Sequence, residues 1–332
     1  MRITGGLASF AILAGLISCQ EPAKRAISGV TAVRPPHEVS AIAIDGDHLW
    51  AGGREGVCRI DLRTATVAGR LEPPRPVTYV RALLMDAKGE LWIGYGAGLL
   101  VWDGVSWRSF SQKDGLPDDR VTCLLQDHSG RIWAGTWGGA ACLENGRWKV
   151  IRKTDGLCDD MVNVMMEDRD GGLWFGSYVA PTGGLSLLET DGKWRRWTVA
   201  DGLPHNNINC LFQESGGAVW AAAGFLDRGG ACRFDKRGDK WNLDRVIGRK
   251  DGLAGDKCRS VFQDSGGIYW FGSEYDGTAR YDGKGWRVLT EADGFSGQEA
   301  KAVLEDRSGG LWFATNDGVT RLDREARGVL SK

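Results

Sequence analysis

Short hydrophobic runs and polar turns alternate along most of the chain. In the copy around Trp133, an apolar run over 121–126 ends in a polar turn over 127–130. A second run carries the tryptophan, and a glycine-rich loop leads to a third run over 139–143. Another polar turn precedes a fourth run, which begins near Trp148. Short runs bounded by Gly, Asn and Asp are typical of β-strands joined by tight turns.

This four-strand unit occurs seven times. The repeated tryptophan has the same context in every copy, at Leu49-Trp50, Leu91-Trp92, Ile132-Trp133, Leu173-Trp174, Val219-Trp220, Tyr269-Trp270 and Leu311-Trp312. Successive tryptophans are 42, 41, 41, 46, 50 and 42 residues apart. Such a period is typical of propeller blades, whereas sandwiches and barrels do not demand it. We therefore predict an all-β fold, a seven-bladed β-propeller of four-stranded antiparallel blades over 39–332, with the tryptophan rings packed between blades.

The first and last copies depart from the pattern. The first copy ends without the Asp-Gly-Leu sequence that closes most others, and the seventh runs only to about Asp323. The seventh blade then lacks a fourth strand of its own. We expect that either residues 30–33 or residues 327–330 complete this blade and close the ring.

The N-terminus predicts a targeting segment. Arg2 is followed by an apolar stretch over 3–17 that is too short to span a bilayer comfortably. It ends in Leu16-Ile17-Ser18-Cys19 and is similar to a bacterial lipoprotein signal, in which cleavage precedes a cysteine that receives a lipid. We expect a signal peptide over 1–18, lipidation of Cys19 and a tether over 19–38. An ordinary signal peptide is the alternative.

Composition narrows the choice of partners. The 332 residues carry a net charge of −1, with no large surplus of either sign, so nothing predicts the basic face that would neutralise phosphates, and nucleic-acid binding is not expected. Most of the seven cysteines other than Cys19 are interpreted as small core residues, whereas Cys158 and Cys258, at blade junctions, are expected to be exposed. We expect a monomer that contacts the membrane only through its lipid.

The repeated motif Asp-x-x-Gly-x-Leu-Trp-x-Gly, followed by a glycine-rich loop and Asp-Gly-Leu, resembles the two-component regulator propeller repeats over about residues 39–323. Those repeats form extracytoplasmic sensor regions of hybrid histidine kinases, and members of the group are associated with glycan sensing. The resemblance implies the fold more strongly than a sensing role, since this sequence contains one ring and no kinase. Gln20, in place of an aspartate after the lipidated cysteine, favours the outer membrane of the bacterial envelope.

Aromatic residues predict a ligand site on one face of the ring. The loops from second to third strands share a face with the connections between blades. In five copies these loops carry an aromatic residue, and the seventh copy has an asparagine: Tyr95, Trp137, Tyr178, Phe225, Tyr275 and Asn316. Exposed rings suit a sugar or another ring, and packing between blades is the alternative.

The first strands predict a second ring of residues. Their second positions are all polar, at Ser40, Arg81, Thr122, Asn163, Asn209, Arg259 and Lys301. We expect these side chains in the central channel near the same face. Three are cationic, so the channel mouth should favour an anion or a carboxylated ligand. A channel lined only for solubility is the alternative.

No catalytic, metal or cofactor site is predicted. The repeated aspartates occur once per blade, which is typical of turns and unlike a calcium loop. The sequence has neither a nucleophile elbow nor a zinc-protease motif. His205 is the one histidine expected on the binding face, and streptogramin lyases are propellers of similar repeat style that use a histidine and a metal. The expected function is binding of a glycan or other small ligand; an envelope-protein scaffold is the alternative, and a lyase is the weakest alternative.

Overall fold

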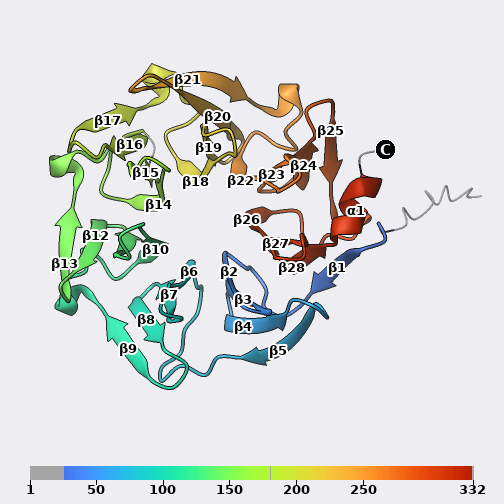
Figure 1. Cartoon of the computed structure of the whole chain (residues 1–332), viewed down its shortest axis with the longest axis horizontal. Coiled ribbons are helices and arrows are strands. Elements are labelled where there is room, and N and C mark those ends of the chain that lie inside the picture. Colours follow the sequence, from blue (N-terminus) through green and yellow to red (C-terminus); the bar gives the residue numbers. More distant parts are fainter. Residues whose placement is uncertain (1–25, 180, 331–332) are drawn as a thin grey trace, which may run out of the picture.

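Each copy of the repeat folds into a four-stranded antiparallel sheet, and the sheets stand as blades around a central axis (Figure 1). This computed structural model describes residues 26–179 and 181–330. The prediction of a seven-bladed β-propeller is confirmed. The predicted signal peptide and Cys19 lie outside the described residues. No helix among residues 26–179 and 181–330 is long and apolar enough to cross a membrane.

The first four blades follow the chain order from the centre outward. Blade 1 contains β2 (Ala41–Asp45), β3 (His48–Gly53), β4 (Gly56–Asp61) and β5 (Thr66–Arg70). Blade 2 contains β6 (Ala82–Met85), β7 (Leu91–Tyr95), β8 (Gly98–Trp102) and β9 (Trp107–Phe110). Blade 3 contains β10 (Val121–Gln126), β11 (Ile132–Thr136), β12 (Gly139–Glu144) and β13 (Arg147–Ile151). Blade 4 contains β14 (Val162–Glu167), β15 (Leu173–Ser177), β16 (Leu185–Leu188) and β17 (Trp194–Trp197).

The next two blades repeat this order, with longer outer strands in blade 5. Blade 5 contains β18 (Ile208–Gln213), β19 (Val219–Phe225), β20 (Arg228–Arg237) and β21 (Lys240–Ile247). Blade 6 contains β22 (Cys258–Gln263), β23 (Tyr269–Ser273), β24 (Thr278–Tyr281) and β25 (Trp286–Leu289). Short 3-10 turns lie between blades at η1 (Gln112–Asp114), η2 (Lys153–Asp155), η3 (Val199–Asp201), η4 (Arg249–Asp251) and η5 (Glu291–Asp293).

The ring is closed by both ends of the described chain. Blade 7 contains β26 (Ala300–Glu305), β27 (Leu311–Thr315) and β28 (Gly318–Leu322), and β1 (Val30–Val33) supplies its outer strand. The pairing is antiparallel, with Val30 opposite Leu322 and Val33 opposite Val319. Of the two expected closing segments, the N-terminal one is the strand. The C-terminal one forms the helix α1 (Arg324–Val329), which lies beside β1 (Figure 1).

The Asp-x-x-Gly turn holds the repeat tryptophan in place. In blade 4 the indole Nε1 of Trp174 donates to Asp168 Oδ2 at 2.8 Å. The other oxygen of Asp168 accepts the backbone N–H groups of Asp170 and Gly172, at 3.0 and 2.9 Å. The same indole bond occurs at Asp86–Trp92, Asp127–Trp133, Asp264–Trp270 and Asp306–Trp312, and a glutamate replaces the aspartate at Glu214–Trp220. The turn function predicted for these aspartates is confirmed.

Neighbouring blades are joined by the residue that precedes this turn. Its side chain accepts the backbone N–H that follows the turn aspartate, or glutamate, of the previous blade. The bonds are 2.7–2.9 Å long and link Ala87 to Gln126, His128 to Glu167, Arg169 to Gln213, Ser215 to Gln263 and Ser265 to Glu305. Because a Gln or Glu at this place satisfies a turn of the neighbouring copy, it sets the spacing between blades.

The hydrophobic core lies between blades rather than within one. Trp174 of blade 4 packs with Ile208, Val219 and Phe234 of blade 5, and its ring is fully buried. The predicted position of the repeat tryptophans is confirmed. The seven cysteines of the described chain are unpaired. The expectation that Cys158 and Cys258 are exposed is wrong: both are buried, because the connections between blades fold inward over the core.

Candidate functional site

A polar hollow occupies the mouth of the central channel. It has a volume of about 270 Å³ and is lined by Glu38, Ser40, Tyr79, Arg81, Thr122, Asn163, Asn209, Arg259 and Lys301. All seven residues expected in the channel therefore line one space, although they come from seven different blades. Glu38 and Tyr79 were not foreseen. Each lies two residues before a predicted channel residue, and this spacing could have identified them as lining residues.

A β-bulge turns five of these side chains into the channel. The pairing of the innermost strand with the second strand shifts by one residue at Thr122, Asn163, Asn209, Arg259 and Lys301. The bulged residue has no partner opposite it, so the strand bends there and the side chain is aimed differently. This explains how a polar residue is tolerated within an apolar strand.

Three of the lining residues also join blades. Asn163 Nδ2 donates to the backbone oxygen of Ile208 at 2.8 Å, and Asn209 Nδ2 donates to that of Cys258 at 2.9 Å. The hydroxyl of Thr122 donates to the Gly135 oxygen at 3.0 Å and contacts the Val162 oxygen. Their donors are used internally, so these residues shape the hollow. The prediction that they bind a ligand stays a prediction.

The cations of the hollow differ in their partners. Glu299 lies 2.8 Å from Arg259 Nε and 3.3 Å from Lys301 Nζ, so these two positive charges share one carboxylate. Arg81 is exposed and has no ion pair among residues 26–179 and 181–330. An anion that enters the hollow therefore meets Arg81, and also the one net positive charge that Arg259 and Lys301 keep after pairing with Glu299.

Tyr79 stands at the rim in a strained conformation. Its φ is 52° and that of Glu38 is 49°, both in the left-handed region that side chains other than glycine seldom adopt. The Tyr79 side chain is 53 % exposed, and the guanidinium of Arg54 lies 5.8 Å from its ring centre. A strained backbone persists only where the surrounding structure holds it in place, and such residues cluster at functional sites.

The residues predicted on the loops of the binding face differ in their burial and in their contacts. Tyr95 is buried and packs with Val57 and Val77, so its assignment to a ligand site is wrong: its side chain points into the space between blades 1 and 2. Trp137 is half-buried, and the Arg120 guanidinium lies 4.3 Å from its ring centre. Asn316 is exposed, but its side-chain oxygen accepts the Glu299 N–H at 3.1 Å.

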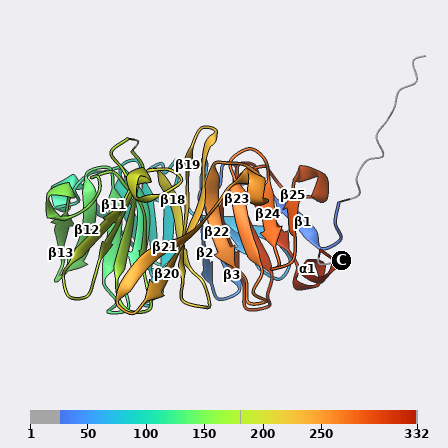
Figure 2. The ribbon, with the colours of Figure 1, turned by 90° about the horizontal axis from the view of Figure 1, so that it is seen from above.

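The remaining aromatics gather over blades 4 to 6. Tyr178 and Phe225 meet edge to face, with ring centres 6.4 Å apart. The hairpin between β19 and β20 carries Phe225 and Leu226 and rises above the neighbouring loops (Figure 2). Leu226 is 62 % and Tyr275 is 61 % exposed, and both line a hollow of about 300 Å³. These four residues, Tyr178, Phe225, Leu226 and Tyr275, form the aromatic cluster, in which Tyr178 is half-buried and the other three are exposed.

His205 lies among cations rather than the acidic residues that a metal would need. Its Nδ1 accepts the Asn207 N–H at 2.9 Å. Burial, with Arg228 and Lys257 nearby, lowers the pKa of His205 below its ordinary value, so the ring is neutral at pH 7. Within residues 26–179 and 181–330, no group of three or more His, Cys, Asp or Glu side chains is arranged to hold a metal.

Comparison with known proteins identifies the type of repeat. The family model described as two component regulator propeller matches residues 115–138 and 156–179. Together with the blade structure, this match supports a propeller of the two-component regulator type. No curated protein sequence matches the chain.

Several solved structures share the fold. The extracellular domain of a hybrid two component system from B. thetaiotaomicron aligns with a TM-score of 0.78 and 19 % identity, over 92 % of this chain and 42 % of that one. This chain thus spans less than half the length of that relative. Virginiamycin B lyase from Staphylococcus aureus, in a catalytically inactive form with quinupristin, aligns with a TM-score of 0.67 and 12 % identity. The alignment covers 88 % of this chain and 98 % of the lyase. A streptogramin B lyase aligns with a TM-score of 0.65 and 13 % identity, over 87 % of this chain and 94 % of the lyase. At these identities the likeness shows the fold alone.

Proposed function

We propose that this propeller binds a carboxylated glycan or a similar small anion at the channel mouth, outside the cytoplasm. The observation that carries the proposal is Arg81, an exposed cation with no ion pair to any residue that the structure describes, in a hollow to which all seven blades contribute. The exposed ring of Tyr79 lines the same hollow and offers a face on which a sugar can stack. Charge and ring together favour an anionic saccharide over a neutral one.

The proposed location rests on the sequence and on the comparisons. A lipoprotein-like segment ends at Cys19, and solved structures with this fold include extracellular domains of a hybrid two component system and of a one component system. We propose that the protein is anchored by a lipid on Cys19 in the bacterial envelope, at the outer membrane, as a monomer. Mass spectrometry of the N-terminal peptide tests this, because a Cys19→Ala variant should lose the lipid and leave the membrane fraction.

A binding titration tests the ligand site. Isothermal titration with acidic and neutral oligosaccharides should show binding of an acidic one, and Arg81→Glu should weaken that binding about tenfold or more, because a charge-assisted contact becomes a repulsion. Arg147, an exposed residue of β13, provides the matched control, and Arg147→Glu should bind normally. Equal affinity in the Arg81→Glu variant would show that the channel mouth is not the site.

The aromatic cluster supports a second candidate function, a scaffold for an envelope protein. Phe225, Leu226 and Tyr275 are large, apolar and exposed on a projecting hairpin and its neighbour. Such residues are typical of interface anchors. If the scaffold function holds, Leu226→Asp abolishes cross-linking to one specific partner and leaves saccharide binding unchanged. We assign no catalytic residue, and a lyase activity would require a metal-dependent reaction that is lost in His205→Ala.

A further inference from the structure

A groove runs between blades 5 and 6 on the flank of the ring. It has a volume of about 630 Å³, and its lining shares no residue with the channel mouth. This volume lies within the ordinary range for small-molecule sites. The groove is therefore a separate space in which a ligand of a few rings can be accommodated.

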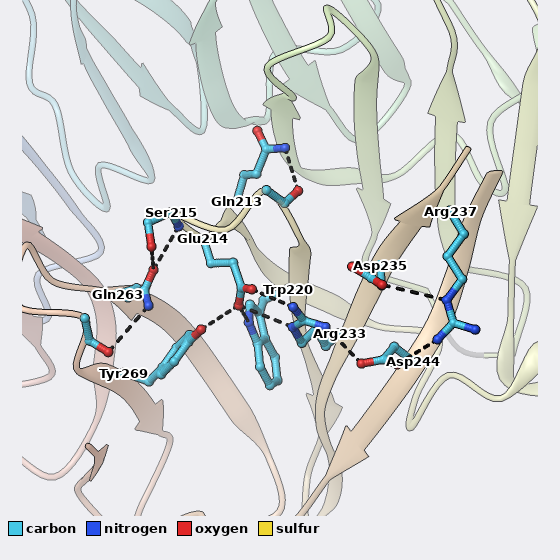
Figure 3. Close-up of polar contacts among 12 residues, drawn as sticks. Gln213, Glu214, Ser215, Trp220, Arg233, Asp235, Arg237, Asp244, Gln263 and Tyr269 are labelled. Carbon is cyan, nitrogen blue, oxygen red and sulfur yellow. Dashed lines mark hydrogen bonds and ion pairs between the residues drawn. The ribbon is translucent and has the colours of Figure 1, made fainter. Parts of the chain in front are cut away.

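Two departures from the repeat meet at the end of this groove. Blade 5 has Glu214 where blades 2, 3, 4, 6 and 7 have an aspartate, and blade 6 has Tyr269 where every other blade has Leu, Ile or Val before the tryptophan. The Tyr269 hydroxyl donates to Glu214 Oε2 at 2.6 Å, across the boundary between the blades (Figure 3). Paired departures from a repeat are expected where a function is supported rather than where a core is packed.

The Glu214 carboxylate organises the groove. Trp220 Nε1 donates to it at 2.7 Å, and Arg233 Nη2 lies 2.7 Å from its other oxygen (Figure 3). Burial alone would raise the pKa of Glu214, but the hydrogen bonds from Arg233, Tyr269 and Trp220 lower it below its ordinary value. Glu214 is thus a charged, fully engaged group that holds two rings and a guanidinium in fixed positions.

One wall of the groove is a continuous aromatic surface. Phe271 lies 5.4 Å from Trp220 and 5.6 Å from Trp286, measured between ring centres. Trp286 stacks on Tyr281 at 4.6 Å, and both side chains are only half-buried. The flat faces of these rings are apolar, and the C–H face of a pyranose can pack against them.

The opposite wall and the end of the groove are charged. Arg245 of β21 lines the groove, is exposed and has no ion pair within residues 26–179 and 181–330. Asp251 of η4 also lines it, and its carboxylate accepts the Gly248 N–H at 2.9 Å. A guanidinium without an internal partner suits a carboxylate, and an exposed carboxylate accepts hydrogen bonds from hydroxyls. Hydroxyls, a carboxylate and an apolar ring face occur together in a uronic acid.

We propose that the groove between blades 5 and 6 is a second binding site, which takes a saccharide unit that carries a carboxylate. The ring packs on Trp286 and Tyr281, the carboxylate pairs with Arg245, and hydroxyls meet Asp251. This site goes beyond the channel mouth proposed above and does not depend on it. A polysaccharide that reaches both sites would bind across the flank and the face of one propeller.

Titration of the purified protein with digalacturonate tests the proposal, with its methyl ester as the uncharged ligand of the same shape. Wild-type protein should bind digalacturonate, and Arg245→Glu should weaken that binding about tenfold or more. The ester should bind weakly to both proteins. Lys149 occupies the same register position in blade 3, opposite Cys142 as Arg245 lies opposite Arg233. Lys149→Glu should therefore bind like the wild type.

The Arg81→Glu variant separates the two sites. If Arg245→Glu loses binding and Arg81→Glu keeps it, the groove is a site and the channel mouth is not the site for this ligand. If Arg81→Glu alone loses binding, the groove proposal is overturned and the channel-mouth proposal stands. Absence of any digalacturonate binding by the wild-type protein also overturns the groove proposal. Arg245 is exposed, so its substitution is not expected to disturb folding.

Discussion

The guanidinium of Arg327 reaches across the closure of the ring to Asp264, with 2.9 Å between Nη1 and Oδ2. Asp264 is the turn aspartate of blade 6, and the same oxygen accepts the Trp270 indole at 3.0 Å. The second nitrogen of Arg327 lies 2.9 Å from Glu305 of blade 7. Helix α1 therefore joins blades 6 and 7 through one buried side chain.

Arg327→Met should destabilise the protein by about 3 kcal/mol, because it leaves the buried carboxylate of Asp264 and the half-buried carboxylate of Glu305 without this cation. Urea unfolding followed by tryptophan fluorescence measures the change. Arg324→Met, on the exposed side of the same helix, is the control and should change the free energy of unfolding by less than about 0.5 kcal/mol. Equal stabilities of the two variants would show that the helix does not hold the ring closed.

Removal of β1 should lower the melting temperature by about 5 °C or more, because the edge of blade 7 loses a paired strand and Val33 leaves the core between blades 7 and 1. The comparison is between a protein that begins at residue 26 and one that begins at residue 34. Differential scanning calorimetry gives both values. An unchanged melting temperature would contradict closure by this strand.

Asp168→Ala should cost about 3 kcal/mol of stability, because a buried indole and two backbone N–H groups lose their acceptor. Asp191 forms an exposed turn and pairs with Lys193, so Asp191→Ala provides the control. Chemical denaturation of both variants measures the difference. A similar small effect in both would mean that the indole bond adds little.

Acid should weaken the fold through the turn carboxylates. Burial alone would raise the pKa of Asp306, but hydrogen bonds from Ser308, Trp312 and Gly310 lower it below the ordinary value of 3.8. A depressed pKa adds stability that is present above the unfolded value and is lost as the pH falls through the folded value. Urea unfolding at about pH 6 and about pH 3 should show this loss, and Asp306→Asn should show less of it. An equal loss in wild type and variant would assign the acid sensitivity to other groups.

The hollow over blades 5 and 6 offers one further test of the exposed aromatics. Tyr275→Ala should leave the melting temperature within about 2 °C of the wild type, because its ring is 61 % exposed. Tyr95→Ala should lower it by more, because that ring is buried between blades 1 and 2. A reversed order would contradict the burial of Tyr95.

Sequence alone determined the repeat and therefore the fold. One blade is specified by the regular spacing of the tryptophans, by the short apolar runs and by an aspartate that lies six residues before most of the tryptophans. A blade can bury its faces only against another blade, so the repeat implies a ring of blades. The same reasoning placed the seven polar channel residues around one axis, because equivalent positions in a closed ring converge. It also found the N-terminal strand as one of two segments available to complete blade 7.

Only the tertiary structure determined which side chains are buried and which residues meet between blades, because the local sequence pattern does not contain this information. Tyr95 and Tyr275 follow equivalent tryptophans, yet one is buried and the other exposed, because the packing of the next blade determines the room for each ring. The partners of the channel cations were likewise undetermined, since Glu299 belongs to a loop that meets Arg259 only after blades 6 and 7 have packed. The groove beside Glu214 and Tyr269 arises between two blades whose departures from the repeat are 55 residues apart. A repeat specifies each blade from nearby residues, but the sites lie between blades, where residues distant in sequence meet.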